Sequence, residues 1–128
     1  MSDSARGKGQ AVYKKLFGTK KTFERDHTAL DGFTIDHLFA NVWSRPNLQM
    51  RQRSMITVAL LAASGRDREL ERHIEGALHL GITRDEIIEI MIHAAHYAGW
   101  PAGHNGQRIA QEMFKSFDEI EAAHEPSK

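Results

Sequence analysis

The chain has 128 residues, 41% of them apolar and 27% charged, a composition typical of one globular domain rather than of a disordered segment. Its 17 basic and 17 acidic residues balance, so the net charge gives no support for binding to nucleic acid or to an anionic membrane. Cysteine is absent, which excludes disulfides, thiolate catalysis and thiolate metal ligands. Since no apolar run approaches the ~20 residues of a membrane span and the opening is polar, we expect a cytoplasmic protein.

The first part of the chain is predicted to form two helices. A short amphipathic segment over 12–17 ends at Gly18, and a longer helix begins with Thr22 as its N-cap and breaks once at Asp31-Gly32. This second helix carries apolar residues at helical spacing, namely Phe23, Leu30, Phe33, Ile35, Leu38, Phe39 and Trp43.

A proline marks the next boundary. The segment 45–47 reads Arg-Pro-Asn, and the residue before a proline leaves the α region. The stretch 55–63 follows and is apolar on nearly all sides, which predicts a buried central helix. It ends at Ser64-Gly65, where glycine can adopt a left-handed cap.

Three further helices are predicted in the second half. The fourth covers about 67–80 and stops at Gly81. The fifth begins at a capping box formed by Thr83 and Glu86 and ends before Gly99. The last begins directly after that glycine and packs through apolar residues three to four positions apart.

No segment alternates in the manner of a strand. We therefore predict an all-α, single-domain bundle of about six helices over 1–128, in which the last helix opens at residue 101 or 102. The ends, 1–8 and 124–128, are expected to be flexible.

Histidines give the first indication of chemistry. Five of the eight fall within residues 73–104, and histidine is the side chain best suited to exchange protons near neutral pH. Glu69 and His73 are one helical turn apart and share a face at the edge of the apolar side. Periodicity alone favours a surface Glu–His pair, with a proton-transfer site as the alternative.

The fifth helix carries a polar stripe opposite its apolar face. The stripe consists of Glu86, Glu89, His93 and His96, with Tyr97 beside it. If the stripe faces solvent, the histidines need no explanation. If it faces a pocket, it supplies two proton carriers and a phenol, and the pattern leaves both interpretations open.

Known catalytic motifs are missing. HExxH does not occur, nor does the Glu-x-x-His spacing of di-iron bundles at the histidines of 73–104, so we expect no metal centre. No GxSxG, P-loop or GxGxxG motif supports a hydrolase, an NTPase or a dinucleotide-binding protein. The small residues of 101–106 open a helix whose free amides could attract a carboxylate, although tight helix packing explains them equally well.

An ordered set of segments resembles the carboxymuconolactone decarboxylase family. The segments are Trp43-Ser-Arg-Pro-Asn-Leu48, Arg51-Gln-Arg-Ser-Met-Ile-Thr57, Glu69-Leu-Glu-Arg-His73, Ala77-Leu-His-Leu-Gly-Ile-Thr83, Asp85-Glu-Ile-Ile-Glu89 and Tyr97-Ala-Gly-Trp-Pro101. Each is weak alone, but together they are specific and extend over about 9–117, nearly the whole domain.

The resemblance implies an all-α, alkylhydroperoxidase-like fold that forms a homo-oligomer, as a trimer or a hexamer. It also implies an enzyme without a cofactor, which converts 4-carboxymuconolactone to β-ketoadipate enol-lactone in protocatechuate breakdown. The wider superfamily includes thiol peroxidases with a Glu…Cys-x-x-Cys-x-x-x-His centre. Here Ser54, Arg66 and Glu69 replace the glutamate and both cysteines, so only His73 remains and that mechanism is excluded.

The sequence departs from the family at positions that we expect to line the pocket. Phe39-Ala40 stands where Trp-Gly is expected, and 79–81 reads His-Leu-Gly instead of Asn-Asn-Gly. Near Tyr97, Trp100 is bulky and His104 is additional. These departures leave the substrate open.

The resemblance leads to a hypothesis for the site that binds a small carboxylate or lactone. Arg45 and Arg53 bind the anion, and His73, oriented by Glu69, transfers a proton. The pocket wall is completed by His93, His96 and Tyr97.

Two alternatives stand beside this hypothesis. One is a related decarboxylase or lactone isomerase acting on a different cyclic acid. The other is a non-catalytic helical oligomer that binds a ligand.

Overall fold

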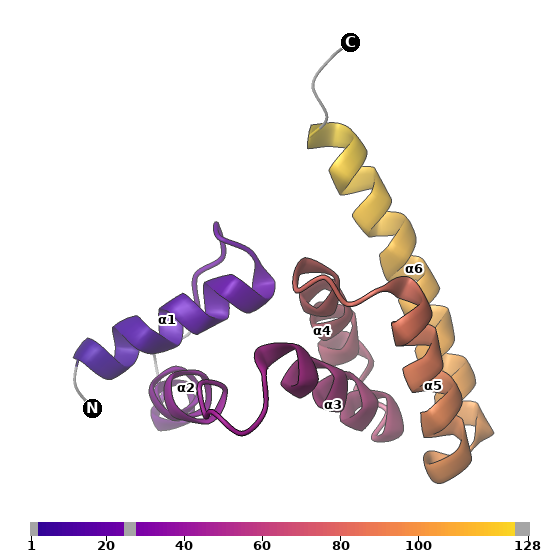
Figure 1. The fold of residues 1–128 in the computed structure, drawn as a ribbon, viewed down its shortest axis with the longest axis horizontal. Coiled ribbons are helices and arrows are strands. Elements are labelled where there is room, and N and C mark those ends of the chain that lie inside the picture. The colour runs from indigo at the N-terminus through magenta and orange to yellow at the C-terminus, as the bar shows by residue number, and fades with distance from the viewer. Residues whose placement is uncertain (1–2, 25–27, 125–128) are drawn as a thin grey trace.

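The computed structural model describes residues 3–24 and 28–124, and within these ranges it contains helices and turns but no strand, which confirms the all-α prediction (Figure 1). The helices are α1 (Asp3–Phe17), α2 (Ala29–Phe33), the π-helix η1 (Thr34–Val42), α3 (Met50–Ala63), α4 (Asp67–His79), α5 (Arg84–Ala98) and α6 (Trp100–His124).

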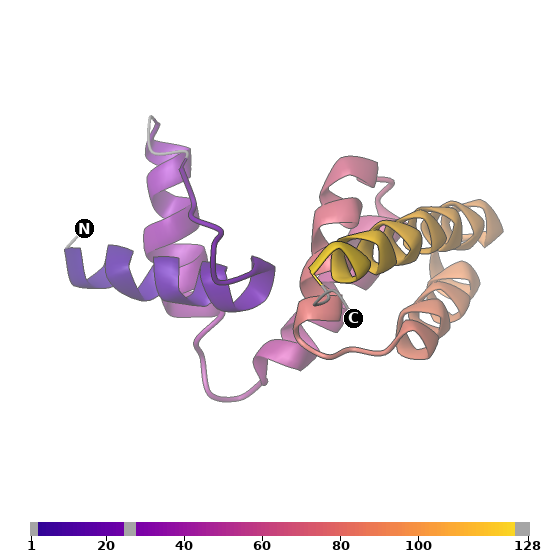
Figure 2. The ribbon, with the colours of Figure 1, turned by 90° about the horizontal axis from the view of Figure 1, so that it is seen from above.

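The helices pack into two groups, each around its own apolar cluster. Helices α3 to α6 form the larger group, and α1, α2 and η1 form a smaller one beside α4 (Figures 1 and 2). The larger cluster is built around Val58, Leu70, Ile74, Ile87, Met91 and Ile109. The smaller cluster consists of Tyr13, Leu16, Phe17, Ile35, Phe39 and Trp43.

Glycines allow α1 to approach both of its neighbours. A Cβ at Gly9 would overlap the carbonyl oxygen of Ile35 in η1, and a Cβ at Gly76 of α4 would lie 3.2 Å from the carbonyl oxygen of Leu16. Helix α1 is also tied to η1 by an ion pair, with 2.9 Å between Arg6 Nη2 and Oδ2 of the buried Asp36. These contacts hold α1 against η1 and α4 together.

The predicted boundaries of the second half are confirmed because they depend on local caps. Gly65, Gly81 and Gly99 have φ values of +69°, +83° and +110°, a region that favours glycine. The capping box of Thr83 and Glu86 is present in both directions. The turn predicted at 45–47 separates η1 from α3, and α6 begins at Trp100, slightly earlier than expected.

The predicted start of the second helix at Thr22 is wrong. The N-cap is Thr28, whose hydroxyl oxygen accepts a hydrogen bond from the backbone N–H of Asp31. Residues 22–24 stay non-helical because the Gln10 side chain binds both the N–H and the carbonyl oxygen of Phe23, each at 2.9 Å. The chain does not break at 31–32, but changes from α to π geometry at Thr34.

The first helix is longer than predicted, and the third is less buried. Helix α1 begins at Asp3 rather than at residue 12, so residues 3–8 are helical, whereas the end segments 1–2 and 125–128 lie outside the described residues. In α3 only Ser54, Val58 and Ala62 are buried, while Leu60 is 63% exposed. Residues 55–63 therefore have two apolar faces. One face is buried against the rest of the chain, and the other is exposed to solvent in the single chain.

Replacement of Gly9 by alanine is expected to loosen α1 from η1. The added methyl group meets a backbone carbonyl that cannot rotate away, so we expect a loss of roughly 1–3 kcal/mol in the free energy of unfolding. Gly7→Ala is the matched control on the same helix, where nothing lies within 4 Å, and it should gain about 0.5–1 kcal/mol. Equal stability of the two variants in urea unfolding would contradict this packing.

Candidate functional site

A cavity lies where the smaller group of helices meets α4. Its volume is about 270 Å³, and residues of α1, α2, η1 and α4 line it together with Phe23. Aromatic rings supply much of its wall, and the polar lining groups on α4 are Glu69, Arg72 and His73. The cavity therefore combines an apolar wall with three titratable groups from α4, and Asp31 of α2 adds a further carboxylate.

His73 is held between aromatic rings. Its ring centroid lies 5.2 Å from that of Phe17, edge-on, and 6.3 Å from that of Trp43, nearly parallel. Its Nδ1 atom is buried and has no hydrogen-bond partner among the described residues. Trp43 itself is buried, so one side of the imidazole is closed to water.

This environment keeps His73 neutral. Loss of water contact, and to a smaller extent the nearby guanidinium of Arg72, lower the pKa of His73 to about 4, although the carboxylate of Glu69 opposes both effects. At neutral pH the imidazole is therefore an uncharged group that can accept a proton, and a negative charge placed beside it would raise its pKa.

Arg72 is a site residue that sequence reasoning missed. Its Nη2 donates a hydrogen bond of 2.6 Å to the Tyr13 hydroxyl, and its Cζ lies 5.2 Å from the centre of the Phe17 ring. Its Nη1 is 3.8 Å from Oε2 of Glu69. The available signal was its position next to His73 and three residues after Glu69, but nothing in the sequence pointed to Tyr13.

The two arginines predicted to bind the anion lie elsewhere. Arg45 is exposed in the turn before α3, and its carbonyl oxygen accepts a hydrogen bond of 3.3 Å from Nη2 of Arg53. Arg53 is half-buried, with no partner at Nε among the described residues. Neither arginine lines the His73 cavity, whereas Glu69 does.

The predicted residues of α5 occupy other places. His93 lines an apolar hollow between α3 and α5, beside Met55 and Ala59. Its ring stacks on that of Tyr97 at 5.0 Å, and Tyr97 is 84% exposed. Within one chain these side chains do not meet His73.

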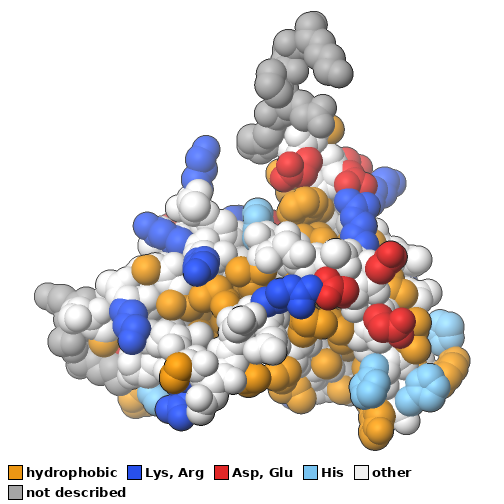
Figure 3. All heavy atoms as spheres, in the orientation of Figure 1, with side chains coloured by type: hydrophobic (Ala, Val, Ile, Leu, Met, Phe, Trp, Pro, Cys, Tyr) orange, Lys and Arg blue, Asp and Glu red, His pale blue; other side chains and the backbone are white. Residues whose placement is uncertain are grey.

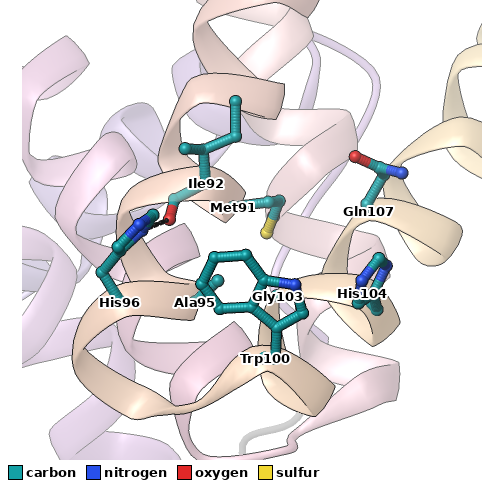
Figure 4. Close-up of a pocket in the computed structure, with 8 residues that line it drawn as sticks. All are labelled: Met91, Ile92, Ala95, His96, Trp100, Gly103, His104 and Gln107. Carbon is teal, nitrogen blue, oxygen red and sulfur yellow. Dashed lines mark hydrogen bonds between the residues drawn. The ribbon is translucent and has the colours of Figure 1, made fainter.

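His96 lines a smaller hollow between α5 and α6 (Figure 4). Its ring is 4.9 Å from that of Trp100, and His104 lines the same hollow. His96 Nδ1 lies 2.7 Å from the carbonyl oxygen of Ile92, which fixes the proton on Nδ1 because a carbonyl only accepts. Figure 3 shows histidine and apolar side chains together at the lower right, where α5 ends and α6 begins.

Two kinds of feature are absent from the described residues, a cluster of metal ligands and a membrane-spanning helix. No three His, Asp or Glu side chains among them lie close enough together to hold a metal ion. None of the described helices is long and apolar enough to span a bilayer.

Comparison with known proteins places the chain in a family. The carboxymuconolactone decarboxylase family matches residues 29–112. A 4-carboxymuconolactone decarboxylase of Acinetobacter baylyi is 36% identical over 123 residues, which cover 90% of this chain and 91% of that protein. A nitrosuccinic acid decarboxylase of Metarhizium robertsii is 41% identical over 64 residues, covering 50% of this chain and 45% of that protein. The chain therefore belongs to the carboxymuconolactone decarboxylase family.

The low pKa of His73 predicts a contribution to acid sensitivity. The unfolded chain takes up this proton near pH 6.5 and the folded protein only near pH 4, so stability falls as the pH is lowered between these values. The part due to His73 is at most about 3 kcal/mol. Urea unfolding across this range should show a shallower pH dependence for His73→Gln than for the wild type. An identical pH dependence would contradict the buried, neutral imidazole.

Proposed function

We propose that the protein is a decarboxylase of a cyclic unsaturated carboxylic acid, with 4-carboxymuconolactone as substrate and β-ketoadipate enol-lactone as product. The observation that carries this proposal is the neutral, largely dehydrated imidazole of His73 in a cavity that also holds a guanidinium. It is supported by similarity to a 4-carboxymuconolactone decarboxylase over 90% of the chain.

The reaction requires little beyond positioning and one proton transfer. The bond between the ring carbon and the leaving carboxylate breaks, and its electron pair moves into the conjugated lactone carbonyl. Carbon dioxide leaves as this bond breaks, and a proton then adds to a carbon of the lactone ring. Because the lactone is its own electron sink, the protein has to orient the acid, stabilise the oxygen that gains charge and supply the proton.

His73 is the group proposed to move this proton. An anionic substrate in the cavity raises the pKa of His73, so binding itself favours the protonated form that donates to carbon. Glu69 supports this step through its charge, which also raises the pKa of His73. Glu69 thus acts as a neighbouring charge, and its ion-pair partner is Arg72.

Replacement of His73 by glutamine is expected to slow carbon dioxide release by roughly 10²- to 10⁴-fold, the usual contribution of an oriented acid or base. His37→Gln is the control, because His37 is exposed on η1 and lines none of the three hollows described above. Circular dichroism should show the same helix content in both variants. Full turnover by a folded His73→Gln protein would remove His73 from the mechanism.

The predicted residues of α5 enter this proposal only through an assembly of several copies of the chain. Large apolar side chains are exposed on α3, α5 and the start of α6, at Ile56, Leu60, Ile92, Tyr97 and Trp100. Such surface is typically buried in symmetric contacts between copies. We propose a homo-oligomer, a trimer or a hexamer, in which His93, His96 and Tyr97 lie at or near a contact between copies.

A charge on the exposed face of α3 is expected to disrupt this assembly. Leu60→Glu should lower the molar mass measured by light scattering toward that of the single 14.5 kDa chain. Gln111→Glu, at an exposed polar position of α6, is the control and should leave the mass unchanged. A wild-type protein that is already monomeric would contradict the proposal directly.

A second candidate is a related enzyme acting on a different acid. It is favoured by the similarity to a nitrosuccinic acid decarboxylase over half of this chain. A panel of lactone acids together with nitrosuccinic acid, followed by carbon dioxide release and by ring absorbance, separates decarboxylation from isomerisation. Ligand binding without turnover of any compound would instead favour a non-catalytic binding protein.

A further inference from the structure

Arg72 is the one cation among the described residues that line the His73 cavity. The other charged lining groups are the carboxylates of Glu69 and Asp31, and both repel an acid. His73 is neutral at pH 7 because its pKa is lowered to about 4. An acid that enters the cavity is therefore attracted by Arg72 alone, which makes this side chain the determinant of where a carboxylate lies.

The guanidinium of Arg72 is positioned before any ligand arrives. Tyr13, which is only 7% exposed, accepts the 2.6 Å hydrogen bond from Nη2, and the ring of Phe17 lies against the guanidinium. Nη1 is 3.8 Å from Glu69, which is longer than a hydrogen bond. A ligand carboxylate can thus form a closer contact with Arg72 than Glu69 does, at little ordering cost.

We propose that Arg72, positioned by Tyr13, binds the carboxylate that the substrate keeps, and so selects acids that carry a second carboxylate besides the one that is lost. This inference rests on the proposed decarboxylase function. 4-Carboxymuconolactone has one carboxylate on the ring carbon that loses carbon dioxide and another on a side chain that is retained. Nitrosuccinic acid likewise has two carboxyl groups.

The direction of charge movement assigns Arg72 to the retained group. During decarboxylation the negative charge leaves the departing carboxylate and moves into the lactone. A guanidinium paired with the departing carboxylate would stabilise the ground state more than the transition state and slow the reaction. Paired with the retained carboxylate, it binds both states equally, so it lowers KM and leaves kcat nearly unchanged.

The test compares two ligands that differ only at the retained group. The probes are 5-oxotetrahydrofuran-2-acetic acid, a saturated lactone that carries the side-chain carboxylate, and its primary amide. Calorimetry at neutral pH gives their affinities for the wild type, Arg72→Met and Arg72→Lys. Arg108→Met is the matched control, since Arg108 is an exposed arginine of α6 that pairs with Glu112.

The wild type and Arg108→Met should bind the acid roughly 10- to 100-fold more tightly than the amide, as expected for a hydrogen-bonded charge pair. Arg72→Met should lose this preference because only the acid binds more weakly, and Arg72→Lys should keep part of it. Tyr13→Phe should weaken acid binding several-fold and leave amide binding unchanged, which marks Tyr13 as a positioning residue.

Two results would overturn the inference. One is an Arg72→Met protein that still prefers the acid. The other is an equal loss of affinity for both probes, which would give Arg72 a purely structural role. Carbon dioxide release by the wild type is measured separately. A protein that prefers the acid through Arg72 but releases no carbon dioxide would therefore count against the decarboxylase function and not against the carboxylate site.

Discussion

The site depends on the docking of α1 against α4. Gly76 lacks a Cβ, which would lie only 3.2 Å from the carbonyl oxygen of Leu16, so the backbone of α4 approaches α1 closely at this point. This approach places Tyr13 and Phe17, which share a face of α1 with Leu16, over the next turn of α4, where Arg72 and His73 lie. A helix without this contact would leave both polar side chains in water.

Docking changes the chemistry of the α4 side chains. In water, histidine titrates near pH 6.5, and a neighbouring arginine has little effect on it. Beside the rings of Phe17 and Trp43 the pKa of His73 is lowered, so the imidazole is uncharged at neutral pH, and the guanidinium of Arg72 donates a hydrogen bond to Tyr13. One helical turn thus presents an uncharged proton carrier beside a cation, an arrangement suited to an acid that brings its own negative charge.

Local signals explain why much of the fold could be predicted from the sequence. The ends of α3, α4 and α5 depend on glycines with positive φ and on the capping box of Thr83 and Glu86, all of which act within a few residues. The start of α2 could not be predicted, because the Gln10 side chain holds Phe23 in a non-helical conformation across 13 positions. Thr28, rather than Thr22, therefore caps the helix.

In the candidate site, too, the local features could be predicted from the sequence and the contacts between distant residues could not. Glu69 and His73 share a helical face, so spacing alone predicted that the two side chains lie side by side, but it favoured a surface pair over a shared cavity. The contact between Arg72 and Tyr13 spans 59 positions and has no sequence signature. The positions of Arg45, Arg53 and His96 outside this cavity likewise depend on tertiary packing. Local sequence patterns do not predict such packing.

The most direct test of an active site at the junction of α1 and α4 is a crystal structure with 5-oxotetrahydrofuran-2-acetate bound. The ligand should occupy the cavity beside His73, with its carboxylate hydrogen-bonded to the guanidinium of Arg72 and closer to it than Glu69 is. A ligand found instead in the hollow between α5 and α6, beside His96 and Trp100, with the His73 cavity empty, would contradict this assignment.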